Sequence, residues 1–164
     1  MKFSSGLEKI IAESRLTAID LSSGYISSYH FLIASLKSDN LPKKIFESNS
    51  WKFEKLIESL KSEEKQKVEK YYLTKEFEST LKHAKYYART YLDNEIKTEH
   101  IILSMIADKK SFAGKYLTEI GMDYSKFKTE CEKSRKMKSK SIYEFFGKNR
   151  FFVSIGIPKF INGI

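Results

Sequence analysis

Residues 98–105, with the sequence Thr-Glu-His-Ile-Ile-Leu-Ser-Met, carry the clearest helix signal in the chain. Thr98 suits the N-cap of a helix, because its hydroxyl can accept a hydrogen bond from a free backbone N–H of the first turn. Glu99 then places a negative charge at the positive end of the helix dipole. His100 opens an apolar run that continues to Ile106, and we therefore expect a buried helix here.

The same design occurs earlier in the chain, at residues 28–35, with the sequence Ser-Tyr-His-Phe-Leu-Ile-Ala-Ser. Ser28 takes the place of Thr98, and His30 takes the place of His100. We expect each histidine to be buried and to tie its helix start to a neighbouring loop. A metal-binding role is disfavoured, because neither histidine has a Cys, Asp or Glu partner at ligand spacing.

The repetition extends beyond these two stretches. The pair Phe3-Ser4 precedes a first amphipathic pattern, and the pair Leu73-Thr74 precedes its equivalent in the second half. Both patterns carry apolar residues at three- and four-residue spacing, which is typical of a helix with one buried face. The polar residue of each pair, Ser4 or Thr74, is suited to cap the helix that follows.

These correspondences predict two pseudo-symmetric units of four helices each. The first unit covers about residues 3–60, its fourth helix being marked by apolar residues within 51–60, and the second covers about residues 73–135. Residues 61–72 are rich in charge and are expected to form a linker. Neither unit can bury its apolar faces alone, so we predict an all-α fold in which the two repeats pack into one domain.

Composition supports helices and excludes several classes of function. The chain of 164 residues is 41% apolar and contains 7 Gly and 2 Pro. Neither a Gly-rich phosphate loop nor a nucleotide fingerprint is present, and we expect no cofactor. No nucleophile–base pair or metal cluster is visible, and we therefore expect no enzyme and no catalytic or metal-binding residue. The single cysteine, Cys131, cannot form an internal disulfide, which favours a reducing, cytoplasmic location.

No membrane association is expected, because the N-terminus lacks the apolar core of a signal peptide and the apolar segment 151–157 is too short to cross a bilayer. Charge is concentrated at the other end. Residues 1–132 hold 22 Lys and Arg against 20 Asp and Glu, whereas residues 133–164 hold 8 against 1. Residues 136–164 are predicted to be a basic, aromatic C-terminal extension. Nucleic-acid binding through this tail is an alternative function, with strong salt dependence.

The duplicated pattern resembles the N-terminal domain of the Clp family of ATP-driven protein unfoldases. Units of that family open with an aromatic-Thr pair, carry an Ala in the long first helix and continue with Ile-Gly-Thr-Glu-His-Ile-Leu-Leu. The second unit here has Leu73-Thr74, Ala88 and residues 96–103, Ile-Lys-Thr-Glu-His-Ile-Ile-Leu. The first has Phe3-Ser4, Ala18 and residues 26–33, Ile-Ser-Ser-Tyr-His-Phe-Leu-Ile. The resemblance covers about residues 3–135.

The chain departs from the family pattern at two kinds of position. Ser27 and Lys97 stand where the family has Gly, and Tyr29 replaces the acidic residue of the first unit. In relatives that bind arginine-phosphorylated proteins, paired acids at these positions receive the guanidinium group. Only Glu99 remains here, and a tyrosine hydroxyl cannot supply the missing charge, which disfavours phosphoarginine as a ligand.

The resemblance implies a non-catalytic domain that docks substrates or adaptor proteins for a Clp-type AAA+ unfoldase and protease. Carried over from the family, the protein-binding positions are Ser4, Tyr29, Thr74 and Glu99. Ser28, His30, Thr98 and His100 are expected to be structural. The sequence shows no ATPase module, which leaves two interpretations, part of a longer protein or a stand-alone accessory subunit that binds the Clp protease core or its ATPase.

Overall fold

The computed structural model describes residues 1–49, 70–108 and 111–148. The chain separates into two compact units, Met1–Cys131 and Glu132–Ile164. The predicted fourth helix at residues 51–60 and nearly all of the predicted linker lie outside the described residues. The predicted boundary at residue 135 stays a prediction.

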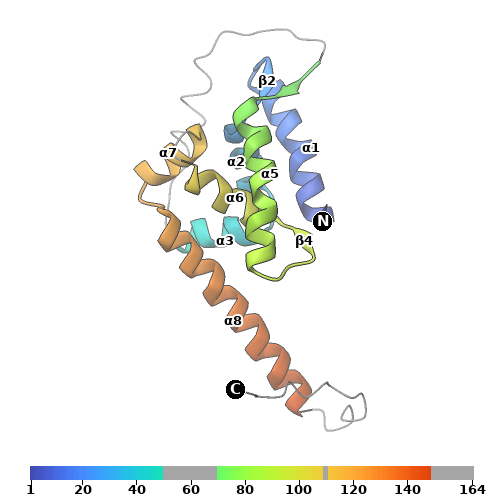
Figure 1. Cartoon of the computed structure of the whole chain (residues 1–164), viewed down its shortest axis with the longest axis vertical. Coiled ribbons are helices and arrows are strands. Elements are labelled where there is room, and N and C mark those ends of the chain that lie inside the picture. Colours follow the sequence, from blue (N-terminus) through green and yellow to red (C-terminus); the bar gives the residue numbers. More distant parts are fainter. Residues whose placement is uncertain (50–69, 109–110, 149–164) are drawn as a thin grey trace. The chain divides into compact units, whose positions relative to one another are not determined.

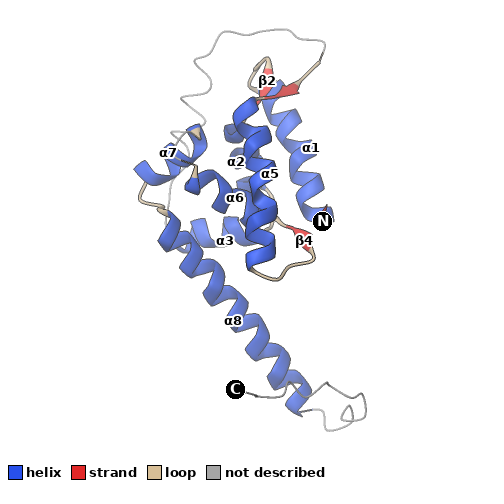
Figure 2. Cartoon of the chain, in the orientation of Figure 1, coloured by secondary structure: helices blue, strands red, loops and turns tan. Residues whose placement is uncertain are grey.

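Helices make up most of the described chain, which confirms the predicted all-α class (Figures 1 and 2). The first half consists of β1 (Lys2–Phe3), α1 (Ser5–Asp20), β2 (Tyr25–Ile26), α2 (Ser28–Lys37) and α3 (Leu41–Ser48). The second half consists of β3 (Tyr72–Leu73), α5 (Lys75–Thr90), β4 (Glu95–Ile96), α6 (Thr98–Ala107), α7 (Phe112–Glu119) and α8 (Tyr124–Lys148).

The long first helix of each half begins and ends in the same way. The Ser4 hydroxyl accepts a hydrogen bond from the Leu7 N–H at 3.3 Å, and the Thr74 hydroxyl accepts one from the Phe77 N–H at 3.2 Å. Past the end of α1, Ser22 adopts a left-handed φ of 57°, and Leu92 does the same past α5. The repeat seen in the sequence is therefore also a repeat of backbone conformation.

The starts of α2 and α6 differ from the sequence prediction by one residue. Ser28 and Thr98 were expected to be N-caps, but they are the first helical residues, and the caps are Ser27 and Lys97. The reason is the histidine of each half. In each half, the Nδ1 atom of the histidine accepts a hydrogen bond from the backbone N–H of the cap residue. Every residue except proline has this N–H, so the cap residue needs no polar side chain.

Two short parallel pairings, which the sequence analysis did not predict, connect the halves. Strand β1 pairs with β4, and β2 pairs with β3. Each pairing continues into the following cap, because the Ser4 N–H donates to the Ile96 carbonyl at 2.9 Å and the Thr74 N–H donates to the Ile26 carbonyl at 2.9 Å. The start of each half is thus joined to the middle of the other half.

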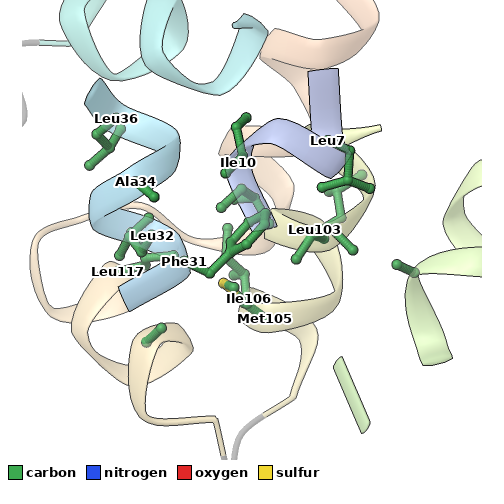
Figure 3. Packing of buried hydrophobic residues seen from close by; sticks show 14 of the residues in the cluster. Leu7, Ile10, Phe31, Leu32, Ala34, Leu36, Leu103, Met105, Ile106 and Leu117 are labelled. Atoms are coloured by element: carbon green, nitrogen blue, oxygen red, sulfur yellow. The ribbon is translucent and has the colours of Figure 1, made fainter. Parts of the chain in front are cut away.

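The core lies between the halves and is built around α2 and α6. Every residue from Thr98 to Ile106 is buried, as expected for a helix that is apolar on nearly all sides. Phe31 of α2 meets Phe77 of α5 with ring centroids 5.4 Å apart, so one aromatic pair spans the two halves. The buried residues labelled in Figure 3 are Leu7, Ile10, Phe31, Leu32, Ala34, Leu36, Leu103, Met105, Ile106 and Leu117.

Helix α7 packs closely against the end of α6, and Gly114 is the point of closest approach. A Cβ atom at Gly114 would overlap the carbonyl oxygen of Met105, so any larger residue would push backbone against backbone. Asp123 begins α8 by accepting the Lys126 N–H at 2.8 Å. Of the helices that the structure describes, none is both long and apolar enough to span a bilayer.

Candidate functional site

The pairing of β2 with β3 brings three helix starts together, and a small pocket lies between them. We call this the first junction pocket. It has a volume of about 200 Å³ and receives side chains from β2 and from the first turns of α2, α5 and α7. Its lining residues are Tyr25, Ser27, Tyr29, His30, Thr74, Glu76 and Phe112.

Aromatic rings form one side of the first junction pocket. The Tyr29 and Phe112 rings stack with their centroids 6.3 Å apart and their planes inclined by 29°. Phe112 is 57% exposed, which is unusual for a phenylalanine that is not covered by a partner. The Lys115 ammonium lies 5.9 Å from the centre of the Phe112 ring, within the range of a cation–π contact.

Glu76 brings a carboxylate to the same pocket. Its Oε1 atom accepts a hydrogen bond from the Ser111 hydroxyl at 2.8 Å, and its Oε2 atom lies 3.4 Å from the Thr74 hydroxyl. Ser111 is the N-cap of α7, so Glu76 links the first turns of two helices. Sequence reasoning missed Glu76, because an acid in the first turn of a capped helix is accounted for by the helix dipole alone.

His30 closes the inner side of the pocket and is uncharged at neutral pH. Burial lowers the pKa of His30 from 6.5 to about 4, because the charged ring would lose its hydration. Its Nδ1 atom accepts the Ser27 N–H at 3.0 Å and lies 2.9 Å from the Ser27 hydroxyl. The ring thus holds the start of α2 in place, next to Tyr29.

The pairing of β1 with β4 forms a second junction, and its chemistry is different. His100 is fully buried there, and its Nε2 atom lies 3.1 Å from Asp93 Oδ2. The other oxygen of Asp93 receives the Lys97 ammonium at 2.6 Å. The first half has Ser23 in the place of Asp93 and Ser27 in the place of Lys97. The two junctions are therefore equivalent in backbone but differ in charge.

The four predicted protein-binding residues divide between the two junctions. Tyr29 and Thr74 line the first junction pocket together, and both are half-buried. Ser4 is half-buried and Glu99 is 7% exposed, and both belong to the second junction. Figure 1 shows the junctions at opposite ends of α5, a helix of 16 residues and therefore about 24 Å long. The four residues do not form one site, and their binding role stays a prediction.

Among the side chains that the structure describes, those of residues 1–49, 70–108 and 111–136, no group of three or more His, Cys, Asp or Glu could hold a metal ion. Cys131 is fully buried. A second hollow of about 470 Å³ lies between α6, α7 and the start of α8.

The fold and the two junctions define a duplicated helical domain, and comparison with known proteins shows which family it resembles. Residues 72–142 match the model of the Clp repeat (R) N-terminal domain. This confirms the resemblance to the N-terminal domain family of Clp ATPases, with the family model covering the second repeat. No curated protein matches the sequence significantly.

Solved structures of Clp-type N-terminal domains share the fold. The N-terminal domain of Hsp104 from Candida albicans aligns over 82% of this chain and 92% of its own, with 20% identity and a TM-score of 0.69. The N-terminal domain of the chaperone ClpD from Arabidopsis thaliana aligns over 81% of this chain and 96% of its own, with 16% identity and a TM-score of 0.58. At 20% and 16% sequence identity, the similarity to these two structures shows a shared fold alone.

Proposed function

We propose that this chain is a non-catalytic docking domain that binds substrate or adaptor proteins for a Clp-type unfoldase. The observation that carries the proposal is the half-open aromatic pocket at the first junction, in a fold shared with Clp N-terminal domains. Binding there needs no chemical step, since aromatic rings and a few polar groups are the usual anchors of a protein interface.

The first junction is favoured over the second as the main contact surface. Tyr25 and Phe112 are 43% and 57% exposed, so a partner would cover apolar area there. At the second junction, Glu99 and His100 are buried, and little of either side chain is open to a partner. Glu99 of the second junction is therefore proposed as a lesser contact.

Site-specific photo-crosslinking tests the proposal. A benzophenone amino acid replaces Phe112 in the full chain, and a matched variant carries it at Tyr86, which is 67% exposed on α5 outside both junctions. Proteins captured in native lysate through position 112, but not through position 86, are identified by mass spectrometry. Their half-lives are then measured in cells with and without this chain.

The proposal expects partners that are specific to position 112 and that are degraded more slowly when the chain is absent. Identical captured sets at both positions, or unchanged half-lives, would refute it. A Clp ATPase or protease subunit as the dominant partner would instead identify an accessory subunit. Capture of nucleic acid alone, lost on removal of residues 133–164, would support the basic tail as the binding element.

A further inference from the structure

The first junction pocket contains one carboxylate facing aromatic rings, and this combination indicates what it binds. We propose that the pocket takes an unmodified basic side chain, arginine in preference to lysine, from an extended segment of the docked protein. Glu76 would be the counter-ion, and Tyr29 and Phe112 would lie against the side chain. This inference rests on the proposed function, because it names the chemistry of the group that docks.

The charge of the lining residues favours a basic ligand. Among the described residues that line the pocket, Glu76 carries a carboxylate, no lysine or arginine is present, and His30 is neutral. An apolar ligand would cover the Glu76 carboxylate without replacing its hydration, which is costly. A basic group would instead form a charge-assisted hydrogen bond with the oxygen near Thr74, where the existing contact is long at 3.4 Å.

The aromatic rings of the pocket also favour a cation, and arginine over lysine. A cation is attracted to the face of an aromatic ring, and the stacked Tyr29 and Phe112 rings bring such faces to the pocket. A planar guanidinium group can in addition stack on a ring, which an ammonium group cannot, so arginine is preferred. The pocket volume of about 200 Å³ is enough for one long side chain.

The same features disfavour phosphoarginine. A phosphoryl group adds negative charge, and the pocket would place it near the Glu76 carboxylate; the Lys115 ammonium lies 5.9 Å from the Phe112 ring centre but is not among the lining residues. The replacement of the family's acidic residue by Tyr29 therefore does not leave this junction without a carboxylate. The junction has the Glu76 carboxylate on α5, to which the Ser111 hydroxyl donates a hydrogen bond at 2.8 Å.

Three peptides that differ at one central position test the inference. The central residue is arginine, citrulline or phosphoarginine, citrulline being the neutral analogue of arginine with nearly the same shape. Each peptide is titrated into the ¹⁵N-labelled full chain, and binding is followed by amide chemical shifts. The arginine peptide should shift amides around Tyr29 and Phe112 and bind about tenfold more tightly than the other two.

Two glutamine variants locate the effect. Glu76→Gln keeps an oxygen for the Ser111 hydroxyl but removes the charge, and it should abolish the preference for arginine over citrulline. Glu78→Gln, in the same helical turn but exposed, is the matched control and should change affinity by less than about twofold.

The inference is overturned if the arginine and citrulline peptides bind equally, if Glu76→Gln keeps the preference, or if the phosphoarginine peptide binds most tightly. Absence of binding at millimolar arginine peptide would also overturn it. None of these results bears on crosslinking through position 112, so failure of the inference can be told apart from failure of the proposed docking function.

Discussion

Acidification from pH 7 to pH 5 should destabilise the fold through His30. The pKa of this ring is lowered by burial from 6.5 to about 4 in the folded chain. Between pH 6.5 and pH 4 the unfolded chain therefore binds more protons than the folded chain. The free energy of unfolding rises with pH in this window, and the contribution of His30 is lost as the pH falls through it.

The size of the effect follows from the two pKa values. At pH 5 the unfolded histidine is almost fully protonated while the buried ring is still mostly neutral. The linkage relation then gives a loss of about 2 kcal/mol between pH 7 and pH 5. Urea unfolding followed by circular dichroism measures this quantity at each pH.

His30→Gln separates the effect from other titrating groups. The glutamine oxygen can still accept the Ser27 N–H, but it does not titrate. The variant should be less stable at pH 7, and its stability should fall by about 2 kcal/mol less than that of the wild type on going to pH 5. Equal pH dependence in the two proteins would refute the reasoning, as would a His30 ring resonance that titrates near pH 6.5 in the folded protein.

Three further changes test the packing. Gly114→Ala should lower the free energy of unfolding by about 3 kcal/mol in urea titrations, because the new methyl group overlaps the Met105 carbonyl; a loss below about 1 kcal/mol would contradict this close approach. Leu92→Gly should increase the free energy of unfolding by about 1 kcal/mol and so raise the melting temperature, because Leu92 is 90% exposed and has a left-handed φ of 57°. A lower melting temperature would contradict backbone strain at this position. Asp93→Asn should cost about 2 kcal/mol by weakening the bond to the buried His100, and an unchanged thermal melt would show that this pair is not stabilising.

The helices could be predicted because their signals are local. The apolar run after His100 and the cap at Thr74 each act within one or two turns, so the sequence around them specifies the outcome. The predicted cap positions of α2 and α6 were wrong by one residue, because the cap of each helix is bound by a histidine side chain and Lys97, unlike Ser27, has no hydroxyl that marks it as a cap. Its role depends on the His100 ring, which reaches back to the Lys97 N–H at 2.9 Å.

The first junction pocket could be predicted only in part. Tyr29 and Thr74 were found because they occupy family positions on which the resemblance rests. Glu76 and Phe112 were not predicted as pocket residues, because they line the pocket only when the start of α7 packs beside the start of α5. The hydrogen bond from Ser111 to Glu76 joins residues far apart in sequence, and no periodicity or local motif records such a contact.

The exchange of strands between the halves has a consequence for how the protein is made. Lys2 pairs with Glu95, and Phe3 pairs with Ile96. At a synthesis rate of about 5–20 residues per second, the first strand must wait roughly 5–20 s for its partner to be made. During that time the N-terminal half has neither its own strand pairing nor the second half of its core, and its apolar helices remain open to chaperones or to other nascent chains.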